Sequence, residues 1–354
     1  MPKGRWWKRS GKSDEQSVRA TFTVEFSPQE ADELTAMWRA TSAERARTLG
    51  AEHPETLRAR FTVGFAELLA GRPTEAEAVL RPLLAAFERV FGPEQPETVN
   101  VRSTLARALA DQNRDAEAER LFRSALAATE PDSEMGIEVR RALVEFLDRR
   151  ERFGEAVPLQ QDVLAKVERE AGRNHADTVT EQGRLADLLR LAGRPAEAMP
   201  IYRDALAGAE QVLGRDNMRT MNIRTLLAQL AMALDDPEAE HVQRGVIADQ
   251  ERQNGPDSPG ALVARNNLAN LLRDRGQSAD AEAEYRALIA DHRRVLGPTH
   301  PGTLITIANL GQLLRDSGRR GEAMSLFREL LPVAEDVLGP DHPVTRDARR
   351  VAAG

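Results

Sequence analysis

Few residues in this sequence of 354 have types and spacing that could support catalysis. Gly11-Lys12-Ser13 has the form of the end of a phosphate-binding loop, but Trp6 stands where that loop needs its first glycine. The chain has no Cys, which excludes thiol nucleophiles, disulfides and cysteine-ligated metal sites. Because no nucleophile, base and orienting group occur together, we expect no enzyme activity, no cofactor and no bound metal ion.

Histidine is the other residue type that could bind a metal ion. Four of the six histidines occupy one equivalent position of a repeated loop. A repeat array spreads such positions along its length, so these side chains cannot converge on one ion. We therefore interpret the four residues as loop caps: His53, His175, His300 and His342.

The composition favours helices and gives the chain an acidic body. Aromatic residues make up 4% of the sequence and charged residues 30%, which disfavours β-sheet. The formal charge is -7, and the first twelve residues carry +5, so the other 342 residues carry -12. An acidic body argues against bulk nucleic-acid binding. No apolar stretch is long enough for a signal peptide or a membrane span, so we expect a cytoplasmic protein.

The first residues form a separate basic segment. Arg5-Trp6-Trp7-Lys8-Arg9 combines cationic and indole side chains, which can contact an anionic membrane surface or a nucleic acid. A disordered, solubilising end accounts for the same residues, because so few charges give only weak attachment. We expect residues 1–21 to form a basic, disordered tail, with weak contact to an anionic surface as the alternative.

A repeat of about 42 residues runs through most of the chain. A loop Gly recurs at intervals of 42, 80, 42, 41, 42 and 42 residues. The interval of 80 contains a weaker copy, which lacks the Gly and begins near Glu130-Pro131. The loop glycines are Gly50, Gly92, Gly172, Gly214, Gly255, Gly297 and Gly339. Seven repeats are therefore expected between about 49 and 337.

Each repeat has the pattern of two helices, A and B, joined by a short turn. When the Thr after the loop is position zero, Leu or Val occupies +7, a small residue usually follows at +8, and Ala occupies +20. Phe or Tyr is frequent at +24, but repeats three and five have Gln160 and Gln243 there. The small residues let the two antiparallel helices approach closely. Pro158 and Pro200, both at +22, are expected to kink helix B without ending it.

This pattern is similar to the tetratricopeptide repeat. The 42-residue period and the sequence Leu-Gly-Pro-x-His-Pro-x-Thr-Leu resemble its kinesin-light-chain-like subclass, which is common in actinobacterial proteins. The resemblance implies an all-α fold, a right-handed superhelical solenoid of antiparallel helix pairs. After the tail we expect an N-terminal capping helix over 22–48, the seven tandem repeats over 49–337 and a C-terminal half-repeat cap over 338–354.

In such a solenoid the A helices line a concave groove, and side chains at +2, +5, +6 and +9 can point into it. Polar residues there are candidates for peptide binding, since an amide can pair with peptide groups of either polarity. They are Arg58, Asn100, Ser103, Arg107, Arg184, Asn222, Gln229, Asn266, Asn267, Asn270, Asn309 and Gln312. The resemblance implies that Asn266, Asn267 and Asn309 grip a peptide backbone. The alternative is that Asn266 and Asn267 only hold neighbouring repeats together.

Five repeats also have an Arg at +4: Arg60, Arg102, Arg140, Arg224 and Arg265. These side chains could recognise a carboxylate of a partner, or they could pair with acidic residues of adjacent repeats.

The sequence therefore favours a noncatalytic scaffold that binds a protein or peptide segment in the concave groove. The alternative is a peptide-sensing regulatory protein, whose superhelix changes pitch on ligand binding and controls a partner. An enzyme of unrecognised type is the third possibility, without a supporting motif.

Overall fold

The computed structural model describes residues 28–352, and every regular element in that range is an α-helix. The basic tail expected over 1–21 and the first residues of the expected capping segment lie outside the described residues. The chain divides into two compact units, one ending at Glu130 and the other beginning at Pro131. This boundary falls in the repeat whose loop lacks the Gly, which is the weakest copy in the sequence.

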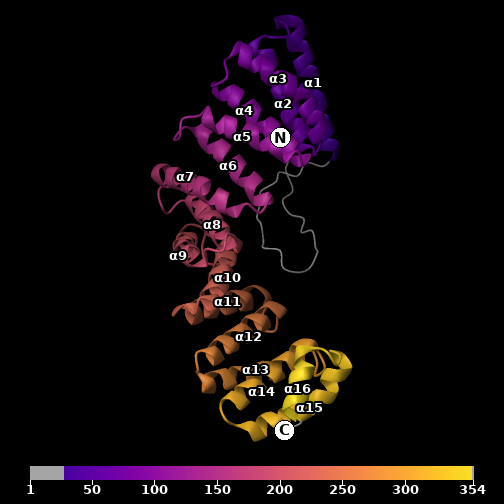
Figure 1. Ribbon diagram of the computed structural model, residues 1–354, viewed down its shortest axis with the longest axis vertical. Coiled ribbons are helices and arrows are strands. Elements are labelled where there is room, and N and C mark those ends of the chain that lie inside the picture. Colours follow the sequence, from indigo (N-terminus) through magenta and orange to yellow (C-terminus); the bar gives the residue numbers. More distant parts are fainter. Residues whose placement is uncertain (1–27, 353–354) are drawn as a thin grey trace. The chain divides into compact units, whose positions relative to one another are not determined.

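The first unit contains a capping helix and two helix pairs (Figure 1). Each helix packs chiefly against the helices before and after it in the chain. The helices are α1 (Pro28–Leu49), α2 (Pro54–Leu69), α3 (Pro73–Val90), α4 (Pro96–Asp111) and α5 (Asp115–Ala127). Even-numbered helices are the A helices of the repeats and odd-numbered helices, from α3 onward, are the B helices.

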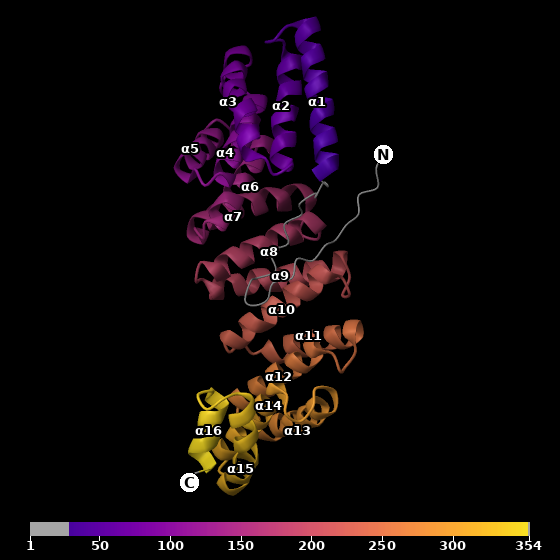
Figure 2. The same ribbon diagram turned by 90° about the vertical axis from the view of Figure 1, so that its right-hand side faces the viewer.

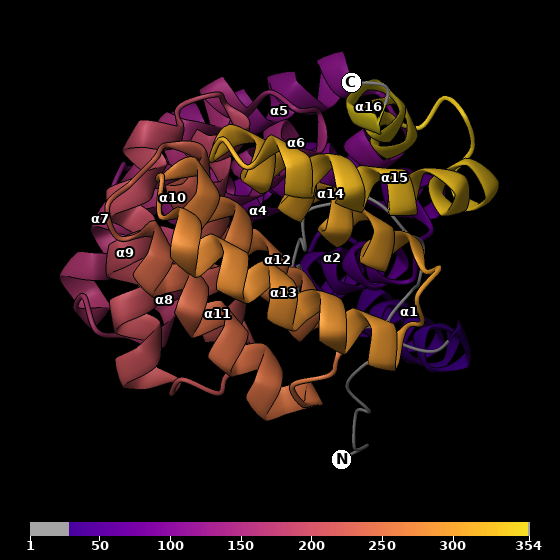
Figure 3. The ribbon, with the colours of Figure 1, turned by 90° about the horizontal axis from the view of Figure 1, so that it is seen from below.

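The second unit contains five helix pairs and a last helix. Figure 2 shows its helices following one another in chain order. In the end-on view of Figure 3, α14 lies beside α12, because A helices of neighbouring repeats also touch. The helices are α6 (Glu134–Arg149), α7 (Phe153–Ala171), α8 (Ala176–Leu191), α9 (Pro195–Val212), α10 (Met218–Ala233), α11 (Ala239–Asn254), α12 (Pro259–Asp274), α13 (Ser278–Val295), α14 (Pro301–Asp316), α15 (Arg320–Val337) and α16 (Pro343–Ala352).

The loop before each A helix is closed by side chains of the repeated motif. The loop glycines have φ between 85° and 100°, a region that only Gly enters without strain. The Nδ1 atoms of the four loop histidines accept backbone N–H bonds two residues ahead, at distances of 3.1 to 3.3 Å. These histidines are therefore loop caps, as the sequence predicts. In four loops the Thr at position zero donates to the carbonyl of the loop Gly: Thr56, Thr178, Thr220 and Thr303.

Within each repeat the two helices meet through small residues. The Ala at +20 is fully buried in every repeat. A Cβ atom added at Gly311 would lie 2.6 Å from the ring of Phe327, so the absence of a side chain at +8 makes room for the aromatic residue at +24. Helices α7 and α9 continue through the exposed Pro158 and Pro200.

The two repeats with Gln at +24 use a hydrogen bond in place of an aromatic ring. Gln160 donates to the carbonyl oxygen of Glu181, and Gln243 donates to the carbonyl oxygen of Ala264. Both acceptors belong to position +3 of the next A helix. A buried amide thus links these repeats to their successors, which explains how the array tolerates the loss of the ring.

Candidate functional site

Four of the five Arg residues at +4 pair with acidic residues of this chain. Arg102 and Arg140 are 6% and 8% exposed, and each bonds both a carboxylate and a loop carbonyl. Arg265 bonds Glu284 and Asp291. Arg60 has no such partner among the described residues. The other Arg side chains are occupied within the protein, which confirms pairing with nearby acidic residues rather than recognition of a partner.

Arg224 forms the most buried of these ion pairs. Its side chain is 3% exposed and pairs with Asp249, which is 4% exposed. A second bond of 2.6 Å joins Arg224 to Glu210 on α9. Gly245 leaves the space that the guanidinium stem occupies, because a Cβ atom there would lie 2.7 Å from Cδ of Arg224.

His292 is a buried titratable group at the end of α13. It is 6% exposed, and its Nδ1 lies 3.1 Å from the hydroxyl of Thr306 on α14. Burial lowers the pKa of His292 below 6.5, and the nearby charges of His300 and Arg265 act in the same direction, while Asp291 opposes them. The neutral imidazole is therefore the form that the folded chain holds.

This burial predicts a loss of stability in mild acid. The unfolded chain binds a proton at His292 more readily than the folded chain does. The contribution of His292 to the free energy of unfolding is therefore fully present above about pH 6.5, and it is lost as the pH decreases toward the lowered pKa. In the His292→Gln variant, which copies Gln250 of repeat five, this contribution is absent. We expect urea unfolding of the wild type to show a slope steeper by up to about 1.4 kcal/mol per pH unit. Equal slopes would contradict the assignment.

The candidate binding residues of the first unit do not form a common cluster. Arg58 pairs with Glu55 and Glu97 and lies over the ring of Phe91, at 5.5 Å from its centroid. Asn100 is exposed and Arg107 is half-buried, and their side chains form no hydrogen bond or ion pair among the described residues. Ser103, which the same pattern includes, is buried.

In the second unit the structure brings Asn270 and Asn309 together. Asn309 Nδ2 donates to Asn270 Oδ1 at 3.4 Å, which joins α14 to α12. The hydroxyl of Tyr285 donates to the same oxygen at 2.5 Å. Burial raises the pKa of Tyr285 to about 12, so this donor stays protonated. The hydroxyl of Tyr285, the aromatic residue at +24, thus fixes the orientation of the Asn270 amide. The NH₂ group of Asn270 remains available to donate hydrogen bonds to a partner.

The other candidates of this unit have different surroundings. Gln312 donates to Asp347 on α16 at 2.8 Å. Asn266 Oδ1 is buried and has no hydrogen-bond partner, so the structure shows no bond through which this atom would hold a neighbouring repeat. The side chains of Asn267, Arg184 and Asn222 are half-buried and form no hydrogen bond or ion pair within the described residues.

Two exposed aliphatic residues, which the sequence analysis did not select, lie beside these amides. Val263 on α12 and Ile305 on α14 are 61% and 37% exposed. Both occupy position +2, and on α12 the spacing of Val263, Asn267 and Asn270 places them on one helix face. The signal was present in the sequence, because +2 is polar in the other repeats. We call Val263, Asn267, Asn270, Ile305, Asn309 and Gln312 the amide face.

The described residues contain neither a membrane-spanning helix nor a cluster of metal ligands. No helix within 28–352 combines the length and apolar character needed to span a membrane. In the same range, no group of three or more His, Asp or Glu side chains is arranged to hold a metal ion.

Comparisons with known proteins agree with this architecture. A family model described as tetratricopeptide repeat matches residues 62–130, 137–211 and 261–336. No curated protein matches the chain.

Three solved structures are among those that match this chain. Nearly identical TPR-like repeats of a putative kinesin light chain from Podosopora anserina have 21% identity and a TM-score of 0.48, covering 58% of this chain and 97% of that one. BtubC from P. vanneervenii has 18% identity and a TM-score of 0.42, covering 77% and 94%. The apo form of RapI has 9% identity and a TM-score of 0.53, covering 91% and 96%, a likeness of fold.

Proposed function

Because the chain belongs to the tetratricopeptide-repeat family, we propose that it is a noncatalytic scaffold that binds a protein or peptide segment. The segment lies along the A helices, in the concave groove that the sequence predicts. The amide face is the part of that groove with the strongest support.

The observation that carries this proposal is the free hydrogen-bonding capacity of the amide face. Among residues 28–352 the Asn267 side chain has no hydrogen-bond partner, and the bonds between Tyr285, Asn270 and Asn309 do not use Asn270 Nδ2 or Asn309 Oδ1. An extended peptide presents N–H and C=O groups alternately, so a donor and an acceptor on adjacent helices match its backbone.

The exposed aliphatic side chains give the same surface a hydrophobic contribution. Val263 and Ile305 lie one helical turn before Asn267 and Asn309 on their respective helices. Each Å² of apolar surface that a partner removes from water contributes roughly 25 cal/mol to the free energy of binding. Such contacts supply affinity, while the amides fix the course of the backbone.

A charged side chain at Val263 tests this proposal. We expect Val263→Arg to reduce retention of partners from a lysate of the native host at least about tenfold, because a long cationic side chain covers the amide face. The melting temperature should stay within about 2 °C, since exposed substitutions rarely change stability by more than roughly 0.5 kcal/mol.

Val295→Arg is the matched control. This valine is 38% exposed and belongs to helix B of the same repeat. The Val295→Arg variant should retain partners from the lysate as well as the wild type does. Equal retention by both variants and the wild type would contradict binding at the amide face.

A further inference from the structure

Neighbouring repeats are joined by one recurrent pair of side chains. The residue at +4 of an A helix bonds a Glu that lies 14 residues earlier, near the end of the preceding helix. The four pairs have distances of 2.5 to 3.3 Å: Arg102–Glu88, Gln182–Glu168, Arg224–Glu210 and Arg349–Glu335. In three of the four pairs a guanidinium group therefore sits on that carboxylate.

The junction between α11 and α12 has the same two residues but not the bond. Arg265 and Glu251 are also 14 residues apart. Arg265 instead donates to Glu284 at 2.9 Å and to Asp291 at 2.7 Å. The side chain of Glu251 forms no hydrogen bond or ion pair among the described residues.

Glu284 is the residue that makes this junction different. It occupies position +23, which is apolar in every other repeat: Val79, Leu121, Leu159, Ile201, Val242 and Leu326. A carboxylate at this position holds the Nε atom of Arg265 toward α13. The missing bond between Arg265 and Glu251 is thus explained by one residue of repeat six, Glu284.

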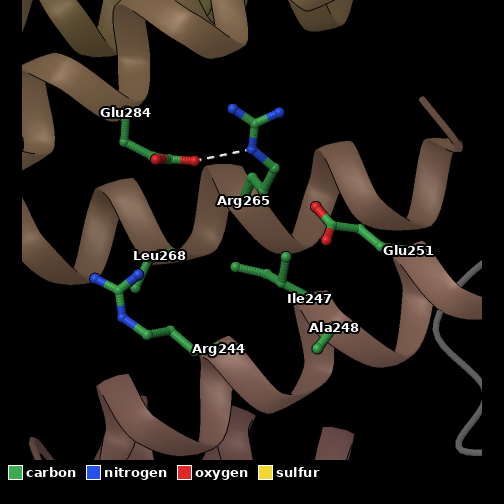
Figure 4. A pocket seen from close by; sticks show the side chains of 7 residues that line it. All are labelled: Arg244, Ile247, Ala248, Glu251, Arg265, Leu268 and Glu284. Carbon is green, nitrogen blue, oxygen red and sulfur yellow. Dashed lines mark hydrogen bonds and ion pairs between the residues drawn. The ribbon is translucent and has the colours of Figure 1, made fainter. Parts of the chain in front are cut away.

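A cavity of about 280 Å³ lies where the missing bond would be. Ile247, Ala248 and Glu251 contribute from one face of α11, and Leu268 contributes from α12 (Figure 4). Figure 4 shows Glu251 on the opposite side of Arg265 from Glu284. The nearby Arg244 is bonded to Glu240, so it does not occupy the Glu251 carboxylate.

We propose that this cavity binds the side chain of an arginine from a partner protein. The guanidinium takes the place on Glu251 that the chain's own arginines take at the closed junctions, through the planar fork that suits a carboxylate. The aliphatic stem covers Ile247, Ala248 and Leu268. This site uses residues outside the amide face and does not depend on binding there.

The test is a nuclear magnetic resonance titration of the full chain with Nα-acetyl-arginine amide. The methyl group of Ala248 lines the cavity and reports on its occupation. We expect a saturable shift of this resonance in the wild type. Nα-acetyl-leucine amide, which has the same backbone groups without the cation, should give none.

Two substitutions act on the Glu251 carboxylate in different ways, and both are expected to weaken binding of the arginine derivative. Glu251→Gln removes the charge that receives the guanidinium. Glu284→Leu restores the apolar residue of the other repeats and releases the Nε side of Arg265, which keeps its bond to Asp291 and can turn toward Glu251 to fill the site from within the chain. Both should raise the dissociation constant at least about tenfold.

Glu329→Gln on α15, an exposed carboxylate, is the control and should bind like the wild type. The other Ala methyl resonances verify that each variant is folded. If Glu284→Leu does not fold, the affinity of Glu251→Gln alone tests the proposal. An unmoved Ala248 resonance in the wild type, or equal affinity in Glu251→Gln, overturns the proposal.

Discussion

Replacing Arg224 by leucine is expected to lower the free energy of unfolding by about 3 to 5 kcal/mol. The change leaves the carboxylate of Asp249 buried, at 4% exposure, without its buried partner. Asp249 keeps its existing ion pair with Arg252, but Arg252 is 48% exposed, and a pair made from solvent contributes little. Urea unfolding of the full chain, followed by circular dichroism, measures the change.

Two variants separate the loss of the pair from the loss of an arginine. Arg286→Leu removes an exposed pair with Glu282 on α13 and should cost less than about 1 kcal/mol. The double variant Arg224→Leu and Asp249→Leu removes both buried charges and should recover most of the stability. A double variant as unstable as Arg224→Leu would contradict the role assigned to the buried carboxylate that Arg224 leaves behind.

The double variant Asn267→Ala and Asn309→Ala is expected to weaken partner binding by about 1 to 3 kcal/mol, roughly 5- to 150-fold. Each substitution removes one amide that can bond a peptide backbone. Stability should change little, because the Asn267 side chain bonds nothing in the described part of the chain and the bond from Asn309 to Asn270 is long, at 3.4 Å. The dissociation constant and the melting temperature of the same preparation measure the two effects.

Asn254→Ala is the control for this pair of substitutions. Asn254 is exposed at the end of α11, outside the amide face, so its removal should leave binding unchanged. A lowered melting temperature with unchanged binding would assign Asn267 and Asn309 to the fold rather than to a partner.

The sequence predicts those features that depend on local spacing. The buried Ala323, the caps at His300 and Thr303, and the helix around them all follow from the repeat register, because each contact spans a few residues or one helix pair. The continuation of α7 through Pro158 also follows, since the ring lies on the exposed side.

The repeat register does not predict which of several nearby side chains a charged residue will bond. The sequence offers Arg265 many carboxylates in its own repeat and the preceding one, and only the spatial arrangement selects Glu284 and Asp291 over Glu251. The exposure of Val263 was missed for a different reason: an aliphatic residue on a helix usually indicates core, although its position, +2, is polar in five other repeats.

Site-specific crosslinking tests the central claim, binding along the A helices, most directly. Because the chain has no Cys, a single cysteine introduced at Val263 can carry a benzophenone group at one defined place on the amide face. The same group at Ala287, an exposed residue of α13, probes helix B. After irradiation in a lysate of the native host, we predict a covalent adduct with a partner from position 263 that an excess of unlabelled chain suppresses, and none from position 287. An adduct from position 287 with none from position 263 would contradict the account.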